Sequence, residues 1–178
     1  MDFDNHLIPN LEEIFNFPFY WGEINQYEAV KLLKGEPEGT FLLRDSADEK
    51  YAFTLSFRPD SPICKNAQIN GCVHTRISVK NHRFHFTCED PKIHTSSDIR
   101  ELLEFYKDRK NCTGLGPLLL FPLFRKQPFS LKELSRAVIC DNTTYDGISY
   151  LSIPETLKSF LRKYHYKNSK EAKYVNAL

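Results

Sequence analysis

The chain has 178 residues, of which 41% are hydrophobic, and its formal net charge is +1 at pH 7. This length accommodates one ordinary domain and a small appendage. A chain so close to neutrality has no general attraction for nucleic acid or anionic membranes, and no apolar segment is long enough to span a bilayer. We therefore expect neither a nucleic-acid partner nor membrane insertion.

The five cysteines form no Cys-x-x-Cys pair, and the N-terminus lacks the pattern of a secretory signal. An odd number of cysteines without export favours a reduced, cytoplasmic setting. The spacing of the cysteines indicates no metal site, and we expect no cofactor. The chain lacks a glycine-rich phosphate cradle leading into a helix, which a phosphatase would need, so we predict that it is not an enzyme.

Two helices are predicted near the N-terminus. Residues 26–33 form an amphipathic helix that ends near Gly35. A shorter helix runs from Pro9 onward and needs a neighbouring domain to pack against. Its apolar residues follow helical spacing: Leu7, Leu11, Ile14 and Phe15.

An arginine lies inside the apolar run 39–46 (GTFLLRDS), which is typical of a buried strand. A buried guanidinium is costly unless it meets an anion, and the neighbours of Arg44 on the same strand face are Leu42 and Ser46. A ligand phosphate would supply that anion, because the planar fork of arginine suits bidentate contact with phosphate oxygens. An internal carboxylate or an exposed sheet edge remains the alternative explanation.

Further strands are predicted at 51–57, 75–79 and 83–87, with a turn-rich connection at 58–72. Ser97 is expected to start a helix over 98–106 that packs on the sheet. The apolar stripe of that helix consists of Ile99, Leu102, Leu103 and Tyr106.

Residues 20–22 (YWG), a helix and then 39–46 (GTFLLRDS) resemble the start of a Src-homology 2 (SH2) domain, and 73–77 (VHTRI) resembles the central strand of that family. The resemblance implies an α+β fold, with a central antiparallel sheet flanked by two helices over residues 20–120. An additional N-terminal helix would occupy 1–19.

The resemblance also implies a phosphotyrosine site. Arg44 would bind the phosphate, Ser46 would donate its hydroxyl, and backbone N–H groups at Ala47 and Asp48 would surround the anion. His74 would line the phenol ring, with Arg76 packing over it or reaching the phosphate. The period of a strand independently places His74 and Arg76 on one face. Ser46 as a simple turn cap and His74 as an ordinary strand residue remain open.

Two features depart from the family pattern. Tyr27 stands where many members have an arginine that binds the phosphate, and Asp48 and Glu49 oppose an incoming anion unless they point outward. We therefore expect the pocket to depend more on Arg44, Ser46 and Arg76.

The C-terminal region follows an expected joint at 122–128 and begins with a capping box from Ser130 to Glu133. Two amphipathic helices are predicted there, and about forty residues rarely form a stable core alone. Their apolar faces therefore pack on the main domain or bind another protein. Those faces contain Leu131, Leu134, Val138 and Ile139 in the first helix, and Leu157, Phe160, Leu161 and Tyr164 in the second.

An SH2 domain followed by such helices resembles the suppressor of cytokine signalling (SOCS) family, and 145–148 and 164–167 resemble its four- and five-type branch most. The resemblance implies a SOCS box at 123–168 and a tail at 169–178. Elongin B and C would be recruited through elongin contacts at Leu131, Leu134, Ser135 and Ile139. A cullin of the five type, with its RING subunit, would be contacted by Leu151, Ser152, Ile153 and Pro154.

Two serines depart from the SOCS-box pattern. Ser135 replaces a cysteine and adds a hydroxyl that needs a partner, which is expected to reduce elongin affinity. Ser152 replaces a proline, which is expected to leave the cullin segment less rigid. Alternatively, Ser152 caps the last helix with Glu155 completing the box.

The resemblance implies a non-enzymatic adaptor. It would capture phosphotyrosine on receptors or kinases and bring a ubiquitin ligase, thereby reducing cytokine or growth-factor signalling. The alternative is an SH2 competitor that masks phosphotyrosine without recruiting a ligase. Little sequence precedes the N-terminal helix, so we expect no kinase-inhibitory segment.

Overall fold

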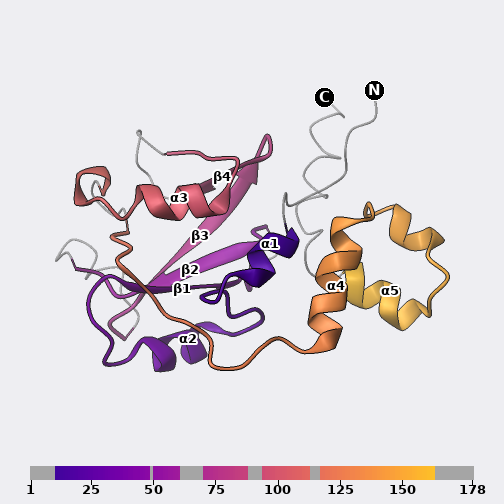
Figure 1. The fold of residues 1–178 in the computed structure, drawn as a ribbon, viewed down its shortest axis with the longest axis horizontal. Coiled ribbons are helices and arrows are strands. Elements are labelled where there is room, and N and C mark those ends of the chain that lie inside the picture. Colours follow the sequence, from indigo (N-terminus) through magenta and orange to yellow (C-terminus); the bar gives the residue numbers. More distant parts are fainter. Residues whose placement is uncertain (1–10, 49, 61–69, 88–93, 113–116, 163–178) are drawn as a thin grey trace.

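A computed structural model describes residues 11–48, 50–60, 70–87, 94–112 and 117–162 (Figure 1). The helices are α1 (Leu11–Asn16), α2 (Gln26–Leu33), α3 (Ile99–Phe105), α4 (Leu131–Asp141) and α5 (Glu155–Arg162). Short 3-10 turns lie at η2 (Arg109–Asn111) and η3 (Gly147–Tyr150). The strands are β1 (Thr40–Asp45), β2 (Phe53–Phe57), β3 (Val73–Lys80), β4 (Arg83–Phe86) and β5 (Phe121–Pro122).

The described strands form one sheet in the order β4-β3-β2-β1-β5. Strands β1, β2, β3 and β4 each pair with the next one in the sequence, and these three pairings are antiparallel. The short β5 pairs with β1 in parallel. The predicted α+β fold is confirmed. The parallel pairing of β5 makes the sheet mixed, and it places Pro122 in the sheet, although the sequence assigned this residue to the joint.

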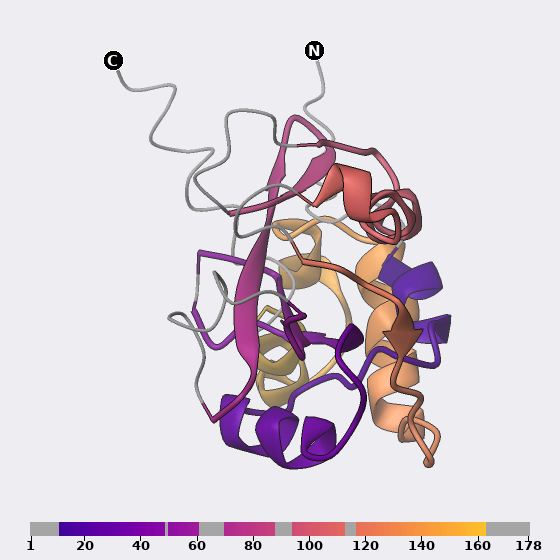
Figure 2. The same ribbon diagram turned by 90° about the vertical axis from the view of Figure 1, so that its left-hand side faces the viewer.

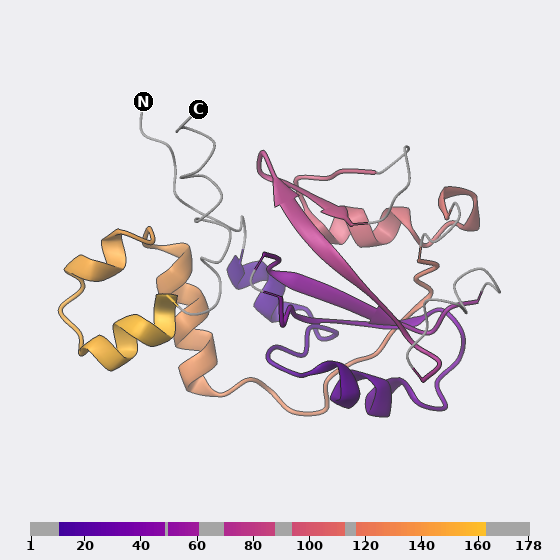
Figure 3. The same cartoon turned by 180° about the vertical axis from the view of Figure 1, so that it is seen from behind.

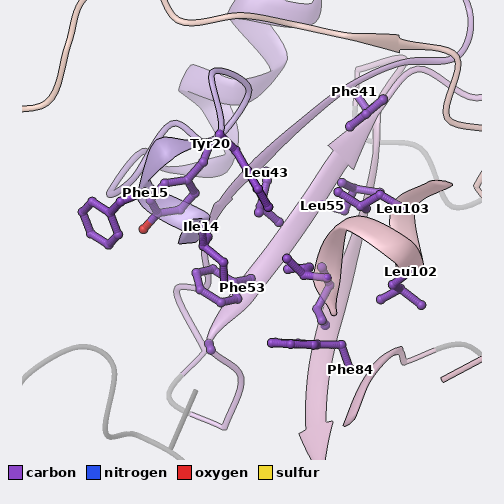
Figure 4. Packing of buried hydrophobic residues seen from close by; sticks show 14 of the residues in the cluster. Ile14, Phe15, Tyr20, Phe41, Leu43, Phe53, Leu55, Phe84, Leu102 and Leu103 are labelled. Atoms are coloured by element: carbon purple, nitrogen blue, oxygen red, sulfur yellow. The ribbon is translucent and has the colours of Figure 1, made fainter. Parts of the chain in front are cut away.

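The two faces of the sheet carry different side chains because residues alternate along a strand. Phe41 and Leu43 of β1 face the large apolar core that α1 and α3 cover (Figure 4). Leu42 faces the other way, where Ala29 and Leu33 of α2 pack on it. Arg44 shares the α2 side, beyond the end of that small apolar cluster.

The predicted capping box from Ser130 to Glu133 is present at the start of α4. Asn25 accepts hydrogen bonds from the first turn of α2, and Glu28 completes its capping box. The predicted start of α3 at Ser97 is wrong, because the side chain of Asp98 accepts the N–H of Arg100 instead. The predicted stripe of α3 is buried, as expected for a helix packed on the sheet. Leu7 and Pro9 lie outside the described residues.

The expected joint is bound to the main domain. Trp21 Nε1 donates to the carbonyl oxygen of Leu123 at 2.9 Å. The Arg125 guanidinium carbon lies 3.8 Å from the centre of the Phe129 ring, and that ring packs against Tyr20 with centroids 5.4 Å apart. These contacts fix the path of the chain between the sheet and α4.

The C-terminal helices continue the core of the main domain. Helix α4 lies beside α1 in Figures 1 and 2, and Ala137 and Cys140 on its inner side are buried in the same cluster as the sheet. Ile148 and Leu161 join that cluster from η3 and α5. Internal packing is therefore confirmed for one side of α4. None of the described helices has the length and apolarity that crossing a membrane requires.

Gly22 provides a test of this junction. Its φ is +67°, and an added Cβ would lie 2.8 Å from the Phe129 ring. We expect Gly22→Ala to lower the free energy of unfolding by about 2–3 kcal/mol, because it adds a clash to the strain of a positive φ. Urea unfolding of the full chain measures this loss.

Gly35→Ala is the matched control, because Gly35 has φ +85° and no described atom lies within 4 Å of its added Cβ. This control should lose about 1 kcal/mol, from backbone strain alone. Equal losses in the two variants would show that Phe129 does not pack tightly on Gly22.

Candidate functional site

The strand register gathers polar side chains on the α2 side of the sheet. Arg44 of β1 pairs with Thr54 of β2, which pairs with Arg76 of β3. Ser56 and His74 form the next pair of β2 and β3 that points to the same face. Because directly paired residues point to the same face, three adjacent strands contribute to one site.

A cavity of about 350 Å³ opens over these side chains and is lined by all six residues predicted for the phosphotyrosine site. Its volume suits a small group such as a phenyl phosphate. The sequence did not predict the contributions of Thr54 from β2 and of Asn25 and Gln26 at the start of α2.

Arg44 is only 4% exposed. Its Nε donates to Ser56 Oγ at 3.0 Å, and its Nη1 donates to the carbonyl oxygen of Asp45 at 3.1 Å. Both of these acceptors are uncharged oxygens, and they orient the guanidinium. A charged ligand oxygen would interact with it more strongly than either.

Ser56 connects Arg44 to His74. The Ser56 hydroxyl oxygen lies 2.8 Å from His74 Nδ1 and already accepts from Arg44, so we assign its hydrogen to Nδ1. Burial, and then the Arg44 charge, lower the pKa of His74 to about 4. The ring is therefore neutral at pH 7, with its hydrogen on Nε2, a buried atom without a hydrogen-bond partner in the described part of the chain.

The turn after β1 is arranged by its own side chains. The N–H of Asp48 donates to Ser46 Oγ at 3.1 Å, although the sequence predicted that this N–H would face the anion. Asp48 Oδ2 lies 3.3 Å from Arg76 Nε, and the Arg76 guanidinium carbon is 5.4 Å from the centre of the Tyr51 ring. Ala47 is exposed at the rim.

The start of α2 borders the same cavity. Asn25 caps the helix, and the N-terminal end of the helix dipole contributes a partial positive charge near the pocket. Tyr27 lies at the rim and is 68% exposed. It stands where the family resemblance would place an arginine, and a phenol can supply one hydrogen bond but no positive charge.

The outer side of α4 is a second candidate surface. Leu131 is 79% exposed, while Leu134 and Ile139 are 38% and 37% exposed. Ser135 lies exposed among them, so the structure brings all four predicted elongin residues to the accessible side of one helix. Figure 3 shows α4 and α5 at the end of the molecule away from the sheet.

The predicted cullin segment precedes α5. Leu151 and Ile153 are half-buried, and Ser152 and Pro154 are exposed. Helix α5 begins at Glu155, and its first bond runs from the Lys158 N–H to the carbonyl oxygen of Pro154 at 3.1 Å. The alternative that Ser152 caps α5 is therefore wrong, because Ser152 precedes the cap by two residues.

Comparisons with known proteins identify both parts of the chain. The sequence model of the SH2 domain matches residues 19–106, and that of the SOCS box matches residues 127–162. The solved SH2 domain of a Monosiga brevicollis CRK/CRKL homolog is 23% identical, with a TM-score of 0.45, and the match covers 61% of this chain and 88% of that one.

Curated relatives match nearly the whole chain. Human suppressor of cytokine signaling 4 is 46% identical over 99% of this chain, and the mouse protein is 48% identical over 94%. Human suppressor of cytokine signaling 5 is 46% identical over 98%. The matched regions span only 38%, 36% and 31% of the lengths of these three relatives.

The order of elements, the buried arginine and the helical appendage define an SH2 domain followed by a SOCS box. The chain belongs to the suppressor of cytokine signalling family and to its four/five branch.

The lowered pKa of His74 predicts a loss of stability in acid. The unfolded histidine titrates near 6.5 and the folded one near 4, so the unfolded state binds the additional proton as the pH falls between these values. We expect His74 to account for about 1–2 kcal/mol of this loss, less than the full shift implies because the ring is partly solvated.

Urea unfolding between pH 4 and pH 7.5 measures the effect, with imidazole NMR signals reporting the pKa directly. His74→Gln should flatten the pH dependence. An equally steep dependence in His74→Gln would contradict the assignment.

Proposed function

We propose that this chain is a phosphotyrosine-binding adaptor that brings an elongin–cullin–RING ubiquitin ligase to tyrosine-phosphorylated receptors or kinases. Joining the two binding sites in one chain raises the effective concentration of the ligase at the captured protein. Ubiquitination of that protein would reduce cytokine or growth-factor signalling. The RING subunit and its conjugating enzyme would supply the chemistry.

The observation that carries this proposal is the buried Arg44 guanidinium at the base of a cavity of about 350 Å³. A phosphotyrosine carries nearly two negative charges and several strong acceptor oxygens, which match Arg44, Arg76 and the hydroxyl of Ser46. Neutral His74 would line the phenol ring, and the N-terminus of α2 would add a favourable dipole. We propose these roles for the side chains that meet in the cavity.

The exposed apolar side of α4 supports the recruitment half of the proposal. A helix with its apolar side exposed is suited to a hydrophobic groove on another protein. The opposite side of α4 is already buried, so the helix would keep its place when a partner binds. Elongin C, with elongin B, is the proposed partner at Leu131, Leu134, Ser135 and Ile139, and a cullin of the five type at 151–154.

Ser135 and Ser152 favour a second candidate function, competition for phosphotyrosine without ligase recruitment. Both serines are exposed on the proposed partner surfaces, where each replaces a residue of the SOCS-box pattern. Co-expression with elongins B and C distinguishes the two functions, because a competitor would purify without them.

Arg44→Ala tests the phosphotyrosine site. We expect it to weaken binding of a phosphotyrosine peptide by about 2–5 kcal/mol, because it removes a buried charge contact. Isothermal titration, using a peptide chosen from a phosphopeptide library, measures the change. Arg109→Ala removes an exposed arginine paired with Asp60 and is the control. Equal affinities of Arg44→Ala and the wild type would remove Arg44 from this role.

Substitutions on α4 test elongin recruitment. Leu131→Ser should reduce co-purification with elongins B and C, because it removes an exposed apolar contact. Ser135→Cys should strengthen binding about fivefold by replacing a hydroxyl with a more hydrophobic group. Phe124→Ser, at an exposed apolar residue before the helix, is the control. Unchanged recruitment in all three variants would exclude this side of α4.

A further inference from the structure

The pocket contains an anion of its own. Asp48 lines the cavity together with Arg44 and Arg76, and its Oδ2 lies 3.3 Å from Arg76 Nε. Arg76 therefore has a carboxylate partner before any ligand enters. A ligand phosphate that binds Arg76 must take the place of this partner.

Asp48 is the more fixed member of the pair. Its Oδ1 accepts the N–H of Lys50 at 3.1 Å, and its own N–H donates to Ser46 Oγ at the same distance. Arg76 has a long, rotatable side chain that is 50% exposed, so it can turn from one anion to another. Ion pairs at this exposure are weak, because water screens them.

We propose that Asp48 competes with the incoming phosphate for Arg76 and thereby lowers the affinity of the pocket for a phosphate dianion. This inference rests on the proposed function, since it concerns the same site. Arg44, which is buried and bound to Ser56, provides the permanent cationic contact. Arg76 adds its charge only when the ligand displaces the carboxylate.

Titration of the full chain with phenyl phosphate at pH 7.5, followed by NMR, tests the proposal. Asp48→Asn keeps an oxygen for the Lys50 N–H but removes the charge, and we expect it to bind about three- to tenfold more tightly. Asp146→Asn is the matched control. Asp146 is exposed in the turn between α4 and η3, and its side chain makes no capping hydrogen bond with the described residues.

The same change in an Arg76→Gln background separates competition from simple repulsion. Competition predicts less than half of the original gain, because the contested side chain is gone. The proposal is overturned if the full gain persists, or if Asp48→Asn binds no more tightly than the wild type.

Failure of the underlying function would look different. A wild-type chain that does not bind phenyl phosphate, or Arg44→Ala that binds it equally well, would remove the phosphate site itself. Wild-type binding that depends on Arg44, without tighter binding by Asp48→Asn, would remove only the role proposed for Asp48.

Discussion

Arg44 carries a positive charge into the sheet at a position where the residue is only 4% exposed. Removing a guanidinium from water costs several kcal/mol even after the protein relaxes, so polar or charged partners have to offset this cost. Ser56 and the carbonyl of Asp45 orient the group by hydrogen bonds. A doubly charged ligand would add a favourable interaction with this buried charge, and we propose that the site prefers an anion for this reason.

The strand that carries Arg44 is also linked to the C-terminal helices. Asp45, the next residue, accepts a hydrogen bond from the Tyr20 hydroxyl at 2.5 Å, and the Tyr20 ring packs on Phe129, directly before the cap of α4. The buried side of α4 belongs to the same cluster as the sheet. The sheet that carries the pocket and the buried side of α4 thus share one continuous core. This core would keep a captured ligand and a recruited partner at a fixed separation.

The sequence predicted the parts of the site that lie along single strands. Arg44 stood out within the run 39–46, the family resemblance added Ser46, His74 and Arg76, and the period of one strand placed His74 and Arg76 on the same face. Thr54 and Ser56 were missed because their positions under the cavity depend on the register between strands. The register shows which polar residues of β2 lie on the same face as Arg44. Aligning the alternating residue patterns of β1 and β2 would have been the sequence signal for Thr54 and Ser56.

In the C-terminal region, the sequence predicted the helices but not which of their sides would be buried. Its helices and capping box were predictable from local patterns, since these depend on residues close in sequence. The patterns left open which apolar residues would be buried internally. Helix α1 settles this by covering Ala137 and Cys140, which leaves Leu131 and Ile139 exposed. β5 was missed because a two-residue strand has no periodicity to detect.

A crystal structure of the full chain with a bound phosphotyrosine peptide would show directly whether Arg44 binds the phosphate. We expect two phosphate oxygens to lie within hydrogen-bond distance of the Arg44 guanidinium, while Ser56 still accepts from its Nε. A phosphate bound elsewhere, with Arg44 neutralised by a carboxylate of the protein, would contradict it.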